Sequence, residues 1–325
     1  MTIQFLKNAT SIFITTIALN SYAQSVLKLE NPPTRAALFG GNLINSSSGE
    51  RDFALSPDGN EIFYTLQSPM QGSFQTILYR TKNAKGIWSK AEIAPFAGNY
   101  SDLEPVFTQD GKGLFFCSNR PISGTNIKDF DIWYVEQINS KWGEPKNIGK
   151  PVNTDKDEFY PSVTAKGNLY FTAAYKSGIG KEDIYMARNI NGKYEEPVLL
   201  DSAVNSKTYE FNAFVSPDES YIIYSSFGRK DDLGGGDLYM SVKDEKGEWR
   251  PAKHLSILNT NRIDYCPFVS NNKKILFFTS ERTFLQNHFE KQVSYAELNK
   301  LYNSPLNGQG NIYWVSFEEI FSLYK

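Results

Sequence analysis

The sequence predicts an all-β protein, a five-bladed β-propeller of four-stranded antiparallel blades. Three observations predict this fold. A serine or threonine that opens a tight turn recurs at spacings of 52, 56, 52 and 54 residues, an acid stands six positions before each, and a β-rich apolar run follows each. Self-similarity at such a period is typical of arrays in which each unit buries its apolar face against its neighbours. The turn residues are Ser56, Thr108, Thr164, Ser216 and Ser270.

Each repeat presents its strands in the same order. A first strand leads into a turn such as Ser56-Pro57-Asp58-Gly59, whose residue types tolerate tight hairpins. A second strand such as residues 221–224 follows, and a tripeptide such as Asp183-Ile184-Tyr185 marks a third. An aromatic residue then precedes the fourth strand, and its recurrence at the blade period indicates packing between blades rather than a platform for sugars. These aromatic residues are Trp88, Trp142, Tyr194 and Trp249.

The last repeat lacks a fourth strand, because the chain ends soon after Asn311-Ile312-Tyr313. Residues 36–44 have the pattern of a fourth strand without its own first three, so we predict that this segment completes the last blade. Such closure joins the two ends of the ring and leaves no open sheet edge. An asparagine five residues before the acid supports the alignment: Asn45, Asn153, Asn205 and Asn259.

The Ser-Pro-Asp-Gly turn, the Asp-Ile-Tyr strand and the ending at Gly247, Trp249 and Pro251 resemble the WD-like β-propeller repeats of the TolB-related superfamily. The resemblance covers about residues 36–316 and implies four-stranded blades around a central channel. It also implies partner binding, although residues 24–45 leave no room for the N-terminal domain of the Tol-Pal propeller, so we transfer no Tol role. Residues 282–310 depart from the period; they are too few for a sixth blade, and we expect a partly helical flap over one face.

We expect a secretory signal peptide at residues 1–23, a lead-in at 24–35 and one propeller domain at 36–325, whose tail at 317–325 forms a short docking helix. Lys7, an apolar run at 12–19 and small residues at 21 and 23 suggest the signal peptide and hence a periplasmic or secreted protein. No later apolar stretch is long enough for a transmembrane segment. The formal charge of -2 and the pI of about 5.9 argue against nucleic acid as a partner. We expect a monomer with two buried free thiols, Cys117 and Cys266.

The recurring acids define the candidate ligand face. In a blade with strands a to d, the d–a loops and the b–c loops lie on one face; the acids fall in the first type and basic residues in the second. The candidate ligand-binding residues are Glu50, Asp102, Glu158, Glu210, Asp264, Arg120, Lys176, Arg229 and Arg282. Five like charges around a channel mouth repel, so the acids should be paired, partly protonated or bridged by a cation. If a divalent cation binds there, oxygen ligands suit calcium or magnesium; otherwise we expect no cofactor.

Two interpretations of this face stay open. Each acid either caps backbone amides and pairs with a nearby cation, or binds a ligand at the channel mouth. We expect a second acid column to be architectural too, with Arg229 paired to Asp237.

The sequence favours a binding module for a protein or glycan partner, with its ligand face at the d–a and b–c loops. The alternative is a carbohydrate-active hydrolase or lyase that uses channel-mouth carboxylates, and a third is a purely structural role in an envelope assembly. Motifs of catalysis are scarce: the chain lacks a Gly-x-Ser-x-Gly elbow, and its two histidines, His254 and His288, have no partners at metal spacing. We therefore identify no catalytic residue and lean against an enzyme.

Overall fold

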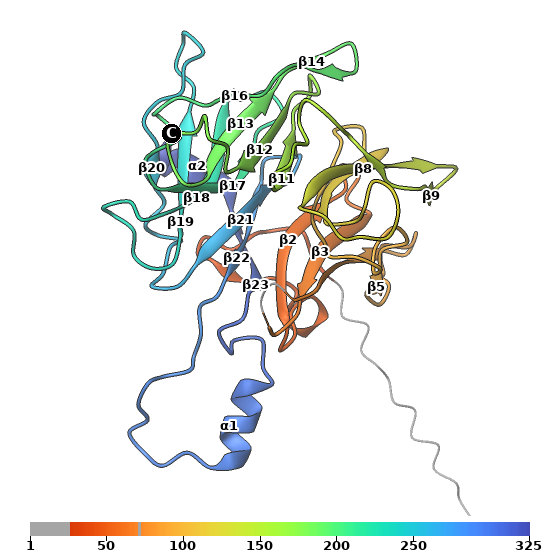
Figure 1. Cartoon of the computed structure of the whole chain (residues 1–325). Coiled ribbons are helices and arrows are strands. Elements are labelled where there is room, and N and C mark those ends of the chain that lie inside the picture. The colour runs from red at the N-terminus through yellow and green to blue at the C-terminus, as the bar shows by residue number, and fades with distance from the viewer. Residues whose placement is uncertain (1–26, 71–72) are drawn as a thin grey trace, which may run out of the picture.

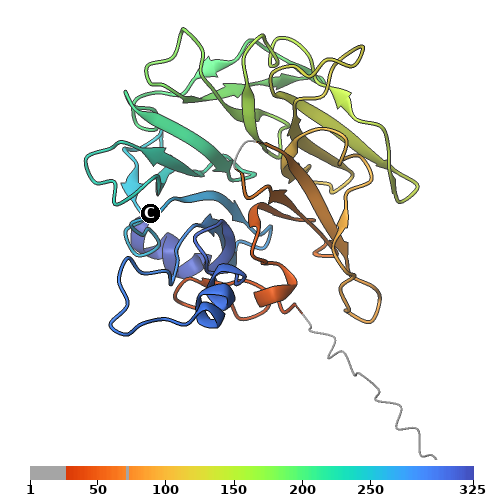
Figure 2. The ribbon, with the colours of Figure 1, turned by 60° about the horizontal axis from the view of Figure 1, so that its bottom comes forward.

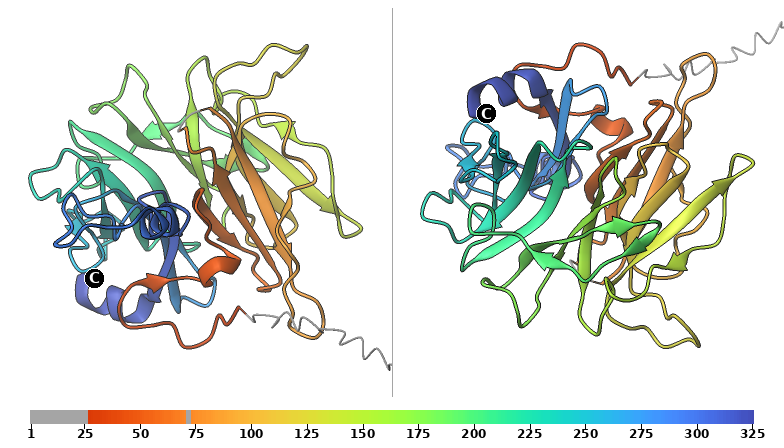
Figure 3. Two further views of the ribbon diagram at one scale, coloured as in Figure 1. Left: turned by 90° about the horizontal axis from the view of Figure 1, so that it is seen from below. Right: turned by 90° about the horizontal axis from the view of Figure 1, so that it is seen from above.

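Five antiparallel sheets stand around a central axis in the computed structural model, which describes residues 27–70 and 73–325 (Figures 1 and 3). Each sheet runs outward through four strands. The five-bladed propeller that the repeat predicts is therefore confirmed. The expected signal peptide lies outside the described residues. Within the described part, no helix is long and apolar enough to cross a bilayer.

Each blade is a meander whose strands run in the order a to d. Blade 1 consists of β2 (Gly49–Leu55), β3 (Glu61–Gln67), β4 (Gln75–Thr81) and β5 (Glu92–Ile93). Blade 2 consists of β6 (Asp102–Phe107), β7 (Gly113–Ser118), β8 (Asp131–Ile138) and β10 (Lys146–Asn147), with β9 (Lys141–Trp142) paired to the end of β8. Blade 3 consists of β11 (Glu158–Val163), β12 (Leu169–Ala173), β13 (Asp183–Ala187) and β16 (Val198–Leu199), with a separate hairpin of β14 (Asn189–Ile190) and β15 (Lys193–Tyr194). Blade 4 consists of β17 (Tyr209–Val215), β18 (Tyr221–Phe227), β19 (Asp237–Val242) and β20 (Lys253–His254). Blade 5 consists of β21 (Asp264–Val269), β22 (Ile275–Ser280), β23 (Asn311–Ser316) and, from the other end of the chain, β1 (Ala37–Leu38).

Every inner strand carries a β-bulge two residues after the recurring acid. The register between strands a and b shifts at this point in all five blades. A bulge bends a strand and strengthens its twist, which lets five inner strands converge on one axis. The bulge residues have left-handed backbones, with φ between 50° and 59°; they are Asp52, Glu104, Tyr160, Asn212 and Cys266.

The ring closes between the two ends of the chain, as predicted. β1 pairs with β23 in antiparallel register, and the amide of Phe39 donates to the carbonyl of Ile312 at 2.8 Å. The same bond joins strands d and c in blades 1 to 4, where Ala94, Ile148, Leu200 and Leu255 donate. The strand is shorter than residues 36–44, because Gly40 and Gly41 adopt positive φ and turn the chain into the 3-10 helix η1 (Gly41–Leu43).

The asparagine column fastens strand c in four blades. In blade 5 the side-chain oxygen of Asn45 accepts from the amide of Ile312 at 2.7 Å. In blade 2 the Asn153 side chain both accepts from the Ile132 amide, at 3.0 Å, and donates to its carbonyl, at 2.8 Å. Asn205 and Asn259 do the same for strands β13 and β19. A buried amide side chain thus satisfies backbone groups where the short fourth strand ends.

Two helices flank blade 5. The C-terminal helix α2 (Phe317–Tyr324) buries Phe317 and Ile320, and Phe317 packs on Tyr221 of blade 4, as expected for a docking helix. The insertion contains α1 (Tyr295–Tyr302), which begins at a capping box of Ser294 and Glu297 and buries no residue. Figures 1 and 2 show that α1 projects away from the ring rather than lying over a face as a flap.

We expect Phe39→Ala to lower the free energy of unfolding by about 3–5 kcal/mol, as for other buried phenylalanines. Phe39 is 1% exposed. Its ring centroid lies 5.3 Å from that of Phe53 in blade 1 and 5.0 Å from that of Phe277 in blade 5, so its side chain joins the first and last blades. Phe284→Ala is the matched control, because Phe284 is 68% exposed and its loss should change stability by less than about 0.5 kcal/mol. Urea denaturation measures both, and an equally small effect for the two variants would contradict the closure.

Candidate functional site

The five recurring acids lie at the start of the inner strands, and each is buried. Each carboxylate accepts a hydrogen bond from the backbone amide four residues earlier, which ties the d–a loop to its strand. The donors are the amides of Ser46, Gly98, Thr154, Ser206 and Thr260, at 2.6–3.2 Å. In four blades the hydroxyl of the same serine or threonine also donates. Each acid therefore holds its own d–a loop against its own inner strand.

In three blades the cation of the b–c loop pairs with the acid. Arg120 contacts Asp102 at 2.6 Å, Arg229 contacts Glu210 at 2.9 Å and Arg282 contacts Asp264 at 3.0 Å. Each guanidinium also donates to a carbonyl of the preceding d–a loop, namely that of Phe96, Val204 or Leu258. The expected pair of Arg229 with Asp237 is wrong, because Asp237 instead contacts His254 Nε2 at 2.8 Å.

Blades 1 and 3 balance their acids differently. No ion pair joins Lys176 to Glu158 within the described chain; the hydroxyl of Tyr175 donates to Glu158 Oε1 at 2.7 Å instead. Burial raises the pKa of Glu158 to about 7, and it raises the pKa of Glu50 to about 7 as well. The repulsion expected of five carboxylates is thus relieved by three ion pairs and two partly protonated acids.

A polar network that sequence reasoning missed fills the channel just beyond the acids. Arg51 Nε contacts Asp52 at 2.8 Å, and its Nη2 contacts Glu104 of blade 2 at 2.8 Å and Cys266 of blade 5 at 3.6 Å. Glu104 also accepts from the Tyr160 amide at 2.6 Å. Burial raises the pKa of Glu104 against the opposing pull of Arg51. The bulge residues therefore meet at the axis and close it.

Little space remains along this axis. Asp52 is 2% exposed and Glu104 is 5% exposed. A cavity of about 20 Å³ lies beside them, lined by Glu104, Tyr160 and neighbouring prolines. That volume suits about one water molecule.

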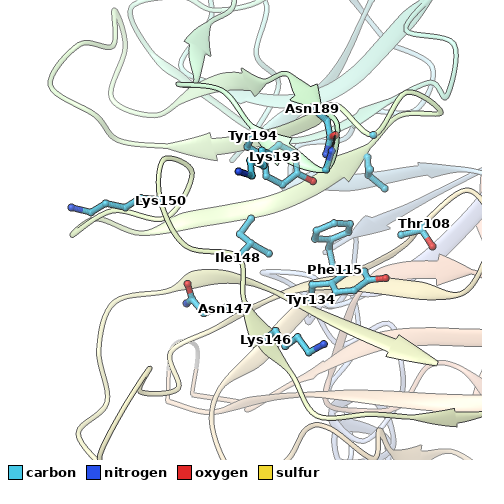
Figure 4. A pocket seen from close by; sticks show the side chains of 13 residues that line it. Thr108, Phe115, Tyr134, Lys146, Asn147, Ile148, Lys150, Asn189, Lys193 and Tyr194 are labelled. Atoms are coloured by element: carbon cyan, nitrogen blue, oxygen red, sulfur yellow. Dashed lines mark hydrogen bonds between the residues drawn. The ribbon is translucent and has the colours of Figure 1, made fainter. Parts of the chain in front are cut away.

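Larger clefts lie elsewhere. One of about 820 Å³ lies within the 282–310 insertion, beside α1. Another, between blades 2 and 3, has a volume of about 720 Å³. We call it the blade 2–3 groove. Figure 4 shows Phe115, Tyr134 and Lys146 on one wall, from blade 2, facing Tyr194 and Lys193 on the other, from blade 3. Its remaining lining residues are Thr108, Asn147, Ile148, Lys150, Val163, Gly167, Asn189 and Gly192.

The equivalent space between blades 1 and 2 is closed by aromatic packing. There the ring centroid of Trp142 lies 5.6 Å from that of Phe63, 5.9 Å from that of Phe96 and 6.1 Å from that of Phe107. One repeat later, Tyr194 stands where Trp142 does and Val163 where Phe107 does.

No phenylalanine of blade 2 takes the place of Phe96 in this second space. In blade 1 the amide of Ala94, two residues before Phe96, donates to the carbonyl of Ile77 in strand c. In blade 2 the amide of Ile148 makes the equivalent bond to Ile132. The position two residues after Ile148 holds the exposed Lys150. Smaller side chains at matched positions therefore leave the groove open.

The sequence carried a signal for this groove that the repeat alignment concealed. The column of Trp88, Trp142 and Trp249 holds tyrosine only in blade 3, a departure that a search for a regular period treats as noise. The channel network was harder to find, because its residue types differ in every blade and only their left-handed backbones are shared.

We expect Glu158→Gln to flatten the pH dependence of stability. The pKa of Glu158 is about 7 in the fold against an ordinary 4.5, so the stability it contributes is present below pH 4.5 and is lost as the pH rises through 7. The variant cannot ionise at this position and should lose less stability over that range. Chemical denaturation at several pH values measures the slope. The exposed Glu196→Gln is the control, and equal slopes for wild type and Glu158→Gln would contradict the assignment.

No family model matches the sequence, and no curated protein matches it. Solved structures similar to it include TolB from Acinetobacter baumannii, at 16% identity and a TM-score of 0.45 over 71% of this chain and 49% of that one, so the chain spans about half of that protein. A putative TolB from Agrobacterium tumefaciens matches at 14% identity and a TM-score of 0.48, over 83% of this chain and 91% of that one. A structure named as a BT0996 RGII complex matches at 9% identity and a TM-score of 0.52, over 88% and 91%. The chain is a five-bladed β-propeller, and the solved structures similar to it include TolB proteins.

Proposed function

We propose that this protein is a binding module of the periplasm or the extracellular space, with a protein or glycan partner held in the blade 2–3 groove. The observation that carries this proposal is the groove itself, open where the matched space between blades 1 and 2 is closed. Its volume of about 720 Å³ falls in the range of small-ligand and peptide sites. The location rests on the expected signal peptide.

The lining has the composition of a recognition site. Phe115, Tyr134 and Tyr194 offer aromatic surface, and the tyrosines add hydroxyl groups. Asn147 and Asn189 are held in place: Asn147 accepts from the amide of Gly149 at 2.8 Å, and Asn189 accepts from that of Gly192 at 2.9 Å. Side chains fixed before binding lose little entropy when a ligand arrives.

The hydrolase alternative has less support. Glycoside hydrolysis needs two carboxyl groups that flank an open space for the sugar. In the channel Asp52 and Glu104 share one guanidinium, and the cavity beside them holds about 20 Å³. The five ring acids are buried and bonded to their own loops. We infer that the ring acids, with Arg120, Arg229 and Arg282, fasten the d–a and b–c loops and that binding occurs at the groove.

A binding screen tests this proposal. The double variant Val163→Phe/Tyr194→Trp restores the two side chains that close the space between blades 1 and 2, so it should fill the groove. Binding to a panel of polysaccharides and peptides is measured by calorimetry, and we expect the double variant to lose at least about tenfold in affinity for any wild-type ligand. The panel includes carbohydrate because the BT0996 structure is named as a complex with RGII.

Tyr302→Trp supplies the matched control, since Tyr302 is exposed on the projecting helix α1. It should bind as the wild type does. Unchanged affinity in the double variant would place the site elsewhere, and release of shorter products from a polysaccharide would favour the hydrolase.

A further inference from the structure

We infer that the ligand of the blade 2–3 groove is a linear glycan that carries repeated anionic groups, either carboxylates or sulfates. The inference rests on the proposed function, because it names the ligand class of that same groove. It comes from the charge of the lining, from the kind of cation that supplies it, and from the shape of the walls.

The lining is cationic in a protein that is not. Lys146, Lys150 and Lys193 all contribute to it, and none of the described residues that line the groove is a carboxylate. The whole chain has a formal charge of -2. No ion pair engages any of these three lysines within residues 27–70 and 73–325, whereas the acid-ring cations Arg120, Arg229 and Arg282 are all paired. Unpaired cations gathered in a cleft attract and steer an anionic partner.

Acidic residues outside the lining limit where the anions bind. Burial raises the pKa of Tyr134, and the nearby carboxylates Glu136 and Asp110 raise it further. Asp110 accepts a hydrogen bond from the hydroxyl of Thr108 at 2.6 Å. Figure 4 places Thr108 at one end of the groove and Lys150 at the other, with Lys193 beside Tyr194 between them. The anionic groups of the ligand therefore lie away from Thr108 and toward Lys146, Lys150 and Lys193.

Lysine rather than arginine suits a ligand with several spaced charges. An arginine fork selects one planar carboxylate or phosphate by two parallel hydrogen bonds, and none of the described residues in the lining is an arginine. An ammonium group is a point charge on a flexible stem, so it accepts an anion from many directions. Three such groups spread along a cleft fit a polymer whose negative charges repeat.

The walls favour a saccharide over an acidic peptide. Phe115 and Tyr134 pack with ring centroids 5.0 Å apart on one wall (Figure 4). Tyr194 faces them from the other wall; unlike Trp142 in the same column, it lines an open groove, so the packing role expected from the period does not exclude a sugar contact here. Aromatic faces of this kind cover the C–H face of a pyranose ring. A peptide commonly binds by adding a strand to a free sheet edge, and the edge that the groove offers, β10, is only two residues long.

The test compares polygalacturonate, chondroitin sulfate, neutral amylose and a poly-glutamate peptide as ligands of the full chain. We expect the first two, or one of them, to bind more tightly than the others, and to weaken as salt rises because exposed charges are screened. The variant Lys146→Gln/Lys150→Gln/Lys193→Gln should lose about tenfold or more in affinity, since an exposed ion pair commonly contributes a factor of roughly two to five. The matched control Lys85→Gln/Lys90→Gln/Lys207→Gln changes the net charge equally, at exposed lysines outside the groove, and should lose less than about twofold.

The outcomes separate this inference from the proposed function. A preference for polygalacturonate or for chondroitin sulfate identifies the carboxylate or the sulfate as the anionic group. Equal loss of affinity in the two triple variants overturns the inference, and so does binding of amylose as tight as that of the anionic glycans. The groove-filling variant Val163→Phe/Tyr194→Trp then still tests the proposed function, because it asks only whether binding occurs in the groove. Tighter binding of poly-glutamate than of either anionic glycan overturns the glycan and indicates an acidic protein partner. No binding of any of the four ligands also overturns it.

Discussion

The pairing of β1 with β23 is the interaction on which the rest of this structure depends. Blade 5 takes three strands from one end of the chain and its fourth from the other. The Phe39 amide bond to Ile312 and the Asn45 bond to the same residue connect positions more than 260 apart in sequence. The contact between blades 5 and 1 depends on this closure, and so does the channel network in which Arg51 reaches Glu104 of blade 2 and Cys266 of blade 5.

Closure of the ring crowds the inner strands, each of which carries a recurring acid and a bulge residue, around one axis. The chemistry of these residues follows from that crowding. Buried carboxylates in a medium of low dielectric must be paired, protonated or hydrogen-bonded. Blades 2, 4 and 5 use arginine, and blades 1 and 3 use hydroxyl groups and raised pKa values. Because the acids are used in this way, the face that looks most like a binding site in the sequence is occupied by its own loops. We therefore propose that binding uses the side of the ring, where the space between blades 2 and 3 is less filled than the space between blades 1 and 2.

The sequence predicted what repeats and missed what does not. The acid column, the asparagine column and the N-terminal strand that completes the last blade all follow from the period. The number of blades follows from them. The short length of β1 depends on the local backbone of Gly40 and Gly41, which a strand pattern does not reveal. The pairing of Arg229 was misassigned because spacing alone does not say which of two nearby acids a long side chain reaches. The groove is a difference between repeats, at Val163 and Tyr194, and the channel network joins unlike residues from every blade; neither has a periodic signature.

Native-state hydrogen exchange at the amide of Phe39 tests the closure most directly. That amide donates to Ile312 as the amide of Ala94 donates to Ile77 in blade 1, where the fourth strand follows in the same stretch of chain. If the ring is closed as described, the Phe39 amide exchanges only through global unfolding, with the same opening free energy as the Ala94 amide. Exchange of Phe39 at the rate of an exposed loop, while Ala94 stays protected, would show that the N-terminal strand is not part of the last blade.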